Sequence, residues 1–204
     1  MDGKVVLITG AAGTGKSTLV RTLLERARPF KRVDYGQLLR EHKLRQTGIE
    51  ISYDELRRDS ASVISPQDVA AVDEWLIEQL PTWRTEGNIL IDSHPVTKES
   101  FGFRITPFSL DQVRRIGFDA ILVLVGEPNT LARRIAEDRQ GRPNVDSFQA
   151  GFQVQLQAAV AAIYAIACGQ PCFAIDTTQL TPEDVSGIAL DLLRKAGVQF
   201  EDAA

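Results

Sequence analysis

The sequence predicts an α/β fold in three layers, with a five-stranded parallel sheet flanked by helices on both faces. Three observations support this prediction. Short and nearly continuous apolar runs recur along the chain, as in strands that are buried on both faces. Longer stretches with helical periodicity separate these runs, and parallel strands need such crossovers between them. A glycine-rich segment follows the first run, at the place where a strand turns into a helix in folds of this kind.

Each expected element has its own pattern. The strands are expected at residues 5–9, 32–35, 88–92, 120–125 and 172–176, of which the second is the weakest. The first helix is expected to run from the glycine-rich segment through residue 25. Capping residues, prolines and glycines bound five further helices, expected at 65–80 (ending before Pro81), 109–117, 129–140, 147–168 and 181–197. The stretches 41–65, 93–108 and 139–147 read as irregular, and such folds place functional residues in loops beyond strand ends.

The composition limits the classes of protein to which this chain can belong. A chain of 204 residues with 44% hydrophobic and 25% charged residues is expected to form one soluble globular domain. The formal net charge is -4 and no basic block is present, so a surface for duplex nucleic acid is not expected. The two cysteines are too few for a disulfide framework, and the apolar runs are too short for a membrane span or a secretion signal. We therefore expect a cytoplasmic protein without a membrane partner.

The glycine-rich segment carries the strongest functional signal. Residues 10–18 read G-A-A-G-T-G-K-S-T, which has the spacing G-x-x-x-x-G-K-[ST] of a phosphate-binding loop, or P-loop. Small residues let successive backbone N–H groups point at one phosphate, and the helix N-terminus adds a partial positive charge. Lys16 is expected to reach the outer phosphates of ATP, and the Ser17 hydroxyl is expected to bind Mg²⁺. The residues expected to bind the triphosphate are Gly10, Ala12, Gly13, Thr14, Gly15, Lys16, Ser17 and Thr18.

An acidic residue after the third strand is the second candidate. Asp92 follows the apolar residues 89–91, and in P-loop proteins an acid at this place holds Mg²⁺ opposite the P-loop hydroxyl. Capping of a loop is the alternative role for such a residue. Given the P-loop, the sequence favours Asp92 as a metal ligand that takes part in catalysis.

Arginines supply the positive charge that phosphoryl transfer needs. Arg40 and Arg57 follow the second strand, where a phosphoryl acceptor would lie. Four more arginines lie between residues 133 and 142, next to the break at Gly141. Arg139 and Arg142 are expected to close over the transferred phosphate, because planar guanidinium groups match phosphate oxygens. An exposed helix with internal salt bridges is the alternative reading of this cluster.

These segments together resemble a known family. Residues 10–18, 35–36, 54–57, 92–94, 98, 102–103 and 133–134 occur in the order and spacing seen in the archaeal-type adenylate kinases, and the resemblance covers most of residues 3–180. The resemblance implies a P-loop kinase domain over residues 1–204, with an acceptor-binding insert at about 36–66 and a lid at about 134–147. It also implies transfer of the γ-phosphoryl group of Mg-ATP to a nucleoside monophosphate. The residues then expected to bind the acceptor are Tyr35, Gly36, Arg40, Arg57, His94 and Arg104.

Two departures leave the base of the acceptor open between AMP and similar nucleotides. Residues 35–40 are similar to the T-G-D-x-L-R segment of bacterial adenylate kinases, but they keep only its glycine, leucine and arginine. Arg104 stands where the archaeal enzymes usually have an uncharged residue. His94 has two open roles, which are a bond to substrate and a structural bond within its loop.

Two other functions stay open at this level. A P-loop kinase that phosphorylates a hydroxyl of a small metabolite would need a carboxylate as base, and Asp34 or Asp92 could serve. A nucleotide-dependent ATPase that acts as a switch or assembly factor would need no small acceptor. The resemblance further suggests self-association into a homo-oligomer, but the sequence does not locate an interface.

Overall fold

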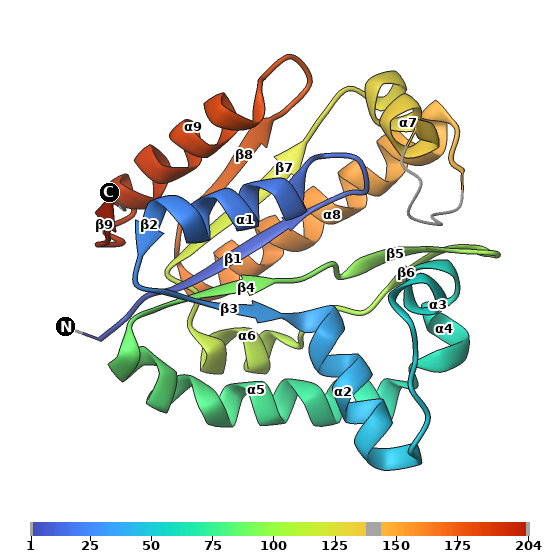
Figure 1. Cartoon of the computed structure of the whole chain (residues 1–204), viewed down its shortest axis with the longest axis horizontal. Coiled ribbons are helices and arrows are strands. Elements are labelled where there is room, and N and C mark those ends of the chain that lie inside the picture. Colours follow the sequence, from blue (N-terminus) through green and yellow to red (C-terminus); the bar gives the residue numbers. More distant parts are fainter. Residues whose placement is uncertain (1, 138–143, 203–204) are drawn as a thin grey trace.

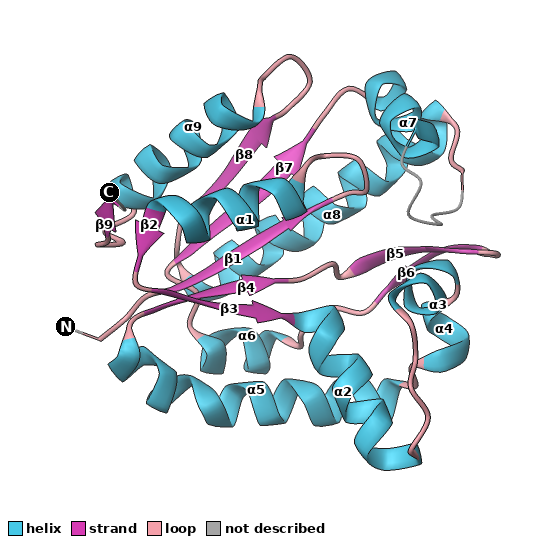
Figure 2. Cartoon of the chain, viewed as in Figure 1, coloured by secondary structure: helices cyan, strands magenta, loops and turns pink. Residues whose placement is uncertain are grey.

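A five-stranded parallel sheet forms the centre of the molecule (Figures 1 and 2). The computed structural model describes residues 2–137 and 144–202. The order of the strands across the sheet is β3-β4-β1-β7-β8, and every neighbouring pair is parallel. The strands are β1 (Val5–Gly10), β3 (Phe30–Asp34), β4 (Asn88–Asp92), β7 (Ala120–Val125) and β8 (Cys172–Asp176). The predicted sheet is therefore confirmed.

Helices cover both faces of this sheet, as the sequence predicts (Figure 2). On one face, α1 (Lys16–Arg26) and α9 (Pro182–Lys195) pack their apolar sides against β1, β7 and β8. On the other face lie α5 (Pro66–Glu86), α6 (Leu110–Ile116) and α8 (Ser147–Cys168). Each of the two layers of side chains is a separate core, and β1, β4 and β7 contribute to both because all their side chains up to position 124 are buried.

The carboxyl ends of the parallel strands meet at one edge of the sheet, and this edge positions the site. In the register of the strands, Asp92 at the end of β4 lies beside Asp34 at the end of β3 and beside Ile8 of β1. The P-loop leaves β1 at the same edge and leads into α1. Three segments far apart in sequence are therefore brought together by strand pairing alone.

The second strand and the stretch after it differ from the prediction. The strand begins at Phe30 and ends at Asp34, whereas Tyr35 is the first residue of α2 (Tyr35–Thr47). Asp34 ends the strand because its carboxylate accepts a hydrogen bond from the Gln37 N–H and caps the helix. The stretch 41–65 is also more helical than expected. It holds the end of α2, α3 (Tyr53–Arg58) and α4 (Ser60–Val63).

Helix α5 does not stop before Pro81, as the sequence suggested, but continues to Glu86. The proline removes one hydrogen bond from the helix, but tertiary contacts hold the following turn. Trp83 packs against the core. Arg84 donates to the carbonyls of Gly3 and Gly117, at 3.0 and 2.8 Å. These contacts are made with segments distant in sequence, so the local pattern does not show them.

Short paired strands occupy stretches that the sequence left without structure. Strands β5 (Val96–Glu99) and β6 (Gly102–Ile105) form a hairpin within 93–108. Only Val96 and Glu99 of its strand residues are buried, so the hairpin lacks the apolar run by which a buried strand is recognised. Strand β2 (Ala27–Arg28) pairs with β9 (Glu201–Asp202). Helix α7 (Pro128–Glu137) begins one residue earlier than expected, and its expected end lies outside the described residues.

Candidate active site

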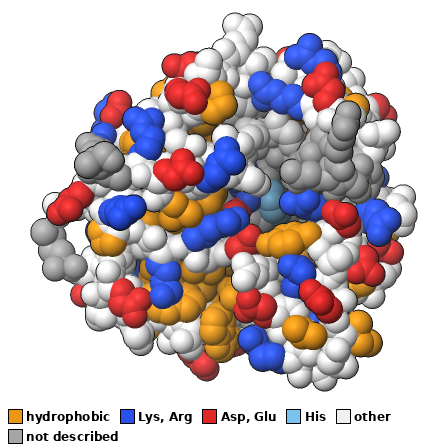
Figure 3. All heavy atoms as spheres, in the orientation of Figure 1, with side chains coloured by type: hydrophobic (Ala, Val, Ile, Leu, Met, Phe, Trp, Pro, Cys, Tyr) orange, Lys and Arg blue, Asp and Glu red, His pale blue; other side chains and the backbone are white. Residues whose placement is uncertain are grey.

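A cavity of about 460 Å³ opens at the carboxyl edge of the sheet. Figure 3 shows a hollow in this face of the molecule with Lys and Arg side chains around it. The P-loop forms one wall of the cavity, and the segment from β3 through α4 forms the opposite wall. The loop after β4 and the β5–β6 hairpin lie between them. The charged residues along the cavity are Lys16, Arg32, Asp34, Arg57, Asp92, Lys98 and Arg104.

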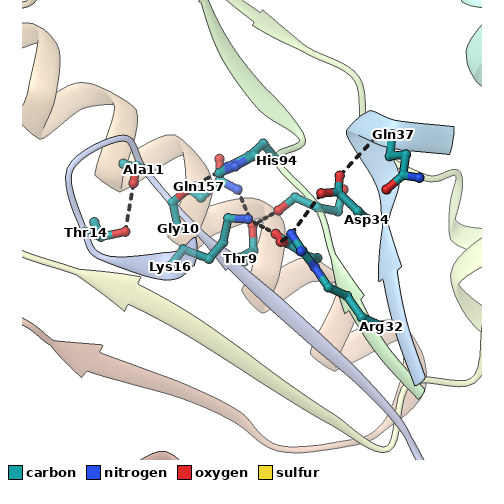
Figure 4. Close-up of polar contacts among 12 residues, drawn as sticks. Thr9, Gly10, Ala11, Thr14, Lys16, Arg32, Asp34, Gln37, His94 and Gln157 are labelled. Carbon is teal, nitrogen blue, oxygen red and sulfur yellow. Dashed lines mark hydrogen bonds and ion pairs between the residues drawn. The ribbon is translucent and has the colours of Figure 1, made fainter. Parts of the chain in front are cut away.

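The P-loop has the backbone that phosphate binding requires. Gly13 and Gly15 have φ values of 79° and 82°, a conformation that other residues rarely adopt. A side chain at Gly10 would come within 2.8 Å of Thr14 Oγ1, so the loop has no room for one there. The Thr14 hydroxyl is buried and donates to the Ala11 carbonyl at 2.8 Å, which fixes the turn rather than facing a ligand (Figure 4). Helix α1 has no side-chain cap, so its first N–H groups can bind an anion.

A chain of ion pairs crosses the floor of the cavity (Figure 4). Lys16 and Asp92 form a buried ion pair, with 4% and 5% of the side-chain surfaces exposed. The Arg32 Nη2 atom lies 3.0 Å from Asp92 Oδ2 and 2.8 Å from Asp34 Oδ2. Two cations therefore compensate Asp92 in a poorly solvated place, where an unpaired carboxylate would be costly. In this arrangement the Lys16 ammonium is directed at Asp92.

The residues at the P-loop fit a magnesium ion. The exposed Ser17 hydroxyl and the Asp92 carboxylate both line the cavity, and oxygen atoms of this kind are the ligands that Mg²⁺ prefers. Among the described residues, no group of three or more His, Cys, Asp or Glu side chains could hold a metal alone. A Mg²⁺ ion here would therefore complete its coordination with substrate phosphates and water, as is usual for phosphoryl-transfer enzymes.

His94 connects the P-loop with the loop after β4. Its Nδ1 atom lies 3.1 Å from the Gly10 carbonyl, which can only accept, so Nδ1 carries the proton (Figure 4). Beside it, Thr9 Oγ1 donates to the Ser93 carbonyl at 2.9 Å, and the Gln157 amide of α8 donates to Thr9 Oγ1. The imidazole is thus held in one orientation and also lines the cavity. The structural bond is present, and a bond to substrate stays a prediction.

Comparisons with known proteins agree with this geometry. A family model described as an AAA domain matches residues 9–149, which is more than half of the chain. The chain belongs to this family. An adenylate kinase of Thermococcus onnurineus is 29% identical over 164 residues, which are 79% of this chain and 80% of that protein. An adenylate kinase of Pyrococcus furiosus is 26% identical over 165 residues, with the same coverage.

Solved structures show the same fold. The thymidylate kinase of Candida albicans superposes with a TM-score of 0.57 at 13% identity, over 100% of this chain and 99% of that one. The tunicamycin resistance protein of Deinococcus radiodurans superposes with a TM-score of 0.54 at 14% identity, over 97% and 98% of the two chains. Family, relatives and fold together identify a P-loop kinase, as the sequence predicts.

Most, but not all, of the residues that the sequence suggested for acceptor binding line the cavity of this P-loop kinase. Tyr35, Gly36, Arg57 and Arg104 line the cavity. Arg40 is not among the described residues that do so. Its Nε–H donates to the Ile51 carbonyl, and its guanidinium lies 4.5 Å from the centre of the Tyr53 ring. Arg40 therefore fastens the loop after α2 to that helix, and its expected role in acceptor binding has no support in its position.

Arg104 has a structural contact that its sequence context does not reveal. Its Nη1 atom donates to the carbonyls of Ser60 and Ile64, both at 3.1 Å. The side chain thus joins β6 of the hairpin to α4 and its end, while it also lines the cavity. The two expected lid arginines, Arg139 and Arg142, lie outside the described residues. Arg134 at the start of the expected lid donates to the carbonyls of Thr177 and Thr178 and so ties α7 to the loop after β8.

Sequence reasoning missed Arg32 as a residue of this site. A charged residue two positions before the end of a weak strand was the available signal, because alternate residues of a strand share one face. Tyr53 was also missed. Its hydroxyl donates to Asp34 Oδ2 at 2.8 Å, and burial together with this bond raises the pKa of Tyr53 to about 12. The Asp34 carboxylate therefore accepts hydrogen bonds from Arg32, from Tyr53 and from the backbone N–H that it caps.

A buried carboxylate that bonds Tyr35 of the cavity gives a prediction on the pH dependence of stability. Tyr35 donates a short hydrogen bond to Asp73 of α5, and burial raises the pKa of Asp73 to about 6. On the same helix, burial raises the pKa of Asp68 less than the bonds from Lys43 and Ser65 lower it, so that it falls to about 2. As the pH rises, the ionisation of Asp73 should therefore lower the free energy of unfolding, whereas that of Asp68 should raise it.

We expect the unfolding free energy to fall as the pH rises from about 4 to about 6, because folded Asp73 binds a proton that the unfolded chain has lost. Asp73→Asn should remove this penalty of about 2 kcal/mol and flatten the profile. Denaturation by urea across this pH range measures the effect. Asp68→Asn is the control. Because the pKa of folded Asp68 is lowered, its contribution to stability is already present above about pH 4, so its loss should lower the free energy of unfolding by a constant amount across this range. If the pH profile of Asp73→Asn were as steep as that of the wild type, the prediction would be contradicted.

Proposed function

We propose that this P-loop kinase transfers the γ-phosphoryl group of Mg-ATP to the phosphate of a nucleoside monophosphate, AMP or a similar nucleotide. The observation that supports this most strongly is the single cavity that joins the P-loop to α3. Lys16 and Ser17 lie at one wall, and Arg57 lies at the other. The relatives named adenylate kinases and the fold shared with a thymidylate kinase are consistent with the proposal.

The residues of this chain would act by positioning and by charge. The P-loop N–H groups and Lys16 would hold the donor phosphates, and Arg57 would hold the acceptor phosphate. Mg²⁺ at Ser17 and Asp92 would neutralise charge on the donor. To bind a phosphate, Lys16 would have to exchange its ion pair with Asp92 for one with the phosphate. Arg32 would then remain to balance the charge of the Asp92 carboxylate. No general base is needed, because a phosphate acceptor is already anionic.

The remaining parts of the proposal follow the sequence. We propose a single kinase domain that has an acceptor-binding insert at about 36–66 and a lid at about 134–147. The insert spans α2 to α4. Closure over bound nucleotides by Arg139 and Arg142 would exclude water and so prevent ATP hydrolysis. We expect the protein to work in the cytoplasm on small-molecule nucleotides.

A panel of acceptors with purified protein, Mg²⁺ and ATP tests the function. AMP, CMP, GMP, UMP and dTMP form the first set, and metabolites with a free hydroxyl form the second, with ADP formation measured by a coupled assay. Transfer to at least one monophosphate is the expected result. Transfer only to a hydroxyl would instead favour Asp34, which lines the cavity, as base. If the protein hydrolyses ATP at a rate that no small acceptor changes, a nucleotide-dependent ATPase switch would be favoured instead.

The proposed role of Arg57 gives a prediction with a matched control. Arg57→Ala should raise the KM for the monophosphate by about 10- to 100-fold and leave the KM for ATP nearly unchanged, because a charge-assisted bond to the acceptor is lost. Arg58→Ala is the control, since Arg58 bonds the Asp54 carbonyl of its own helix and is not among the described residues that line the cavity. Steady-state kinetics with each substrate varied measure the two constants. Equal effects of both variants would contradict the assignment.

A further inference from the structure

One guanidinium group of the cavity has an edge that the fold does not use. Arg104 of β6 lines the cavity, and its Nη1 atom donates two hydrogen bonds, to the carbonyls of Ser60 and Ile64, both at 3.1 Å. Nη1 has two hydrogens, so these two bonds use it fully. The Nε and Nη2 atoms of Arg104 bond no group within the described residues. We call their N–H groups the Arg104 fork, because they are parallel donors that match two neighbouring acceptor atoms.

The β5–β6 hairpin and α4 hold the fork in place. Ser60 accepts from Arg104 through its carbonyl and donates through its hydroxyl to Glu99 Oε1 at 2.6 Å. Thr97 lies directly across from Arg104 in the hairpin and donates to the same Glu99 oxygen at 2.8 Å. Glu99 is 1% exposed and is not among the described residues that line the cavity. The fork is therefore positioned before a ligand binds, which lowers the entropy cost of binding.

The surroundings of the fork suit the base of an acceptor nucleotide. Ile64, whose carbonyl bonds Arg104, lines the cavity together with Leu39 and Val69. These three apolar side chains pack in one cluster. The ring of a base gains from burial against apolar side chains, whereas a charged phosphate does not. A base on this patch would present its polar edge to the fork.

The acceptor phosphate has a different place. It must lie in line with the donor phosphates at the P-loop. The Arg57 guanidinium lies 5.3 Å from the centre of the Tyr53 ring, and the Tyr53 hydroxyl bonds Asp34, one end of the ion-pair chain that holds Asp92. Arg57 is thus connected to the floor beside the P-loop, whereas Arg104 is connected to the apolar patch. This division assigns the phosphate to Arg57 and the base to the Arg104 fork.

We propose that the Arg104 fork selects, as phosphoryl acceptor, a nucleoside monophosphate whose base has two neighbouring acceptor atoms on one edge. Guanine offers O6 and N7, and cytosine offers O2 and N3. Adenine has an amino donor between its N1 and N7 acceptors, and this donor would leave N–H groups of the fork unpaired. Uracil and thymine have no two neighbouring acceptors. The proposal rests on the proposed function and narrows its acceptor to GMP or CMP.

A comparison of monophosphates with purified wild-type protein, Mg²⁺ and ATP tests the proposal. We expect kcat/KM for GMP or CMP to exceed that for AMP, UMP and dTMP by about 10- to 100-fold, which is the usual discrimination by a bidentate pair. The GMP and CMP arms distinguish a purine from a pyrimidine acceptor. A preference for AMP, UMP or dTMP would overturn the proposal and leave the proposed function standing. Transfer to no monophosphate would overturn both.

Two variants of Arg104 separate selection of the base from a structural role. Arg104→Lys keeps a donor for the Ser60 and Ile64 carbonyls but has no planar fork. The ratio of kcat/KM for the preferred nucleotide to that for AMP should therefore fall towards one. Arg104→Met also loses the carbonyl bonds, so it should show the same low ratio together with a lower stability in urea.

Arg57→Lys is the matched control for the base assignment. It should lower kcat/KM for every monophosphate by a similar factor and leave the ratio unchanged, because all monophosphates share the phosphate that Arg57 is proposed to hold. Circular dichroism checks that the three variants fold. If Arg104→Lys also lowered kcat/KM for all monophosphates by one factor and kept the ratio, Arg104 would not select the base, and the proposal would be wrong.

Discussion

Replacement of Lys16 by methionine should lower kcat/KM for phosphoryl transfer by about 10³-fold, which is the loss expected when one preorganised charge at a transferring phosphate is removed. The same change leaves the buried Asp92 carboxylate paired with Arg32, whose Nη2 atom lies 3.0 Å from Asp92 Oδ2. We therefore expect lower stability as well, by on the order of 2 kcal/mol. Steady-state kinetics and urea denaturation measure the two effects.

Two controls separate the catalytic effect of Lys16 from its structural effect. Lys31→Met removes a lysine whose partner Glu86 is exposed, and it should change neither activity nor stability appreciably. Lys16→Met combined with Asp92→Asn removes both charges of the pair and should recover part of the stability but none of the activity. If the double variant regained activity, or if Lys16→Met kept wild-type rates, Lys16 would not act on phosphate.

Asp92→Asn should lower kcat by about 10²- to 10³-fold and raise the Mg²⁺ concentration needed for half-maximal rate. The amide keeps the shape of the side chain but removes the charge that would hold the metal. It also leaves Lys16 without its acidic partner, so the free energy of unfolding should fall too. Magnesium titrations of the initial rate give the shift in metal dependence.

Asp176→Asn is the matched control for Asp92. Asp176 also ends a strand at the same edge of the sheet, but it is exposed, and its pKa is lowered by hydrogen bonds from Thr178. We expect the control to keep the wild-type magnesium dependence. The metal role of Asp92 would be wrong if Asp92→Asn retained that dependence, even with a reduced rate.

The sequence by itself determined the fold class and the P-loop with Asp92 beside it. The central strands β1, β4 and β7 could be predicted because strands buried on both faces are apolar, whereas the edge strand β3 has exposed Lys31 and Arg32 and gave the weakest signal. The P-loop could be predicted because its conformation depends on glycines and small residues within nine consecutive positions. The position of Asp92 at the edge of the sheet follows from the same strand pattern. These are properties that neighbouring residues decide.

The opposite wall of the cavity, from β3 through α4, depends on long side chains, and their positions were predicted less well. Arg40 and Arg57 follow the same strand and look equivalent in sequence, yet Arg57 lines the cavity and Arg40 binds the Ile51 carbonyl. A guanidinium group can reach several places from one backbone position, so its location depends on the carbonyls and rings that packing offers it. Arg32 joined the site for the same reason.

Only the tertiary structure decided the contacts between distant segments. Pairing of β3 with β4 puts Asp34 beside Asp92, and the Lys16–Asp92–Arg32 chain follows from that register. The turn of α5 beyond Pro81 is held by Arg84, which bonds segments far away in sequence. Helix α8 shows the same limit, because its uncharged sequence predicts a buried helix, and only the packed structure shows that Phe148 and Ile166 are exposed. Local pattern specifies backbone form, whereas the partner of each side chain is a property of the packed molecule.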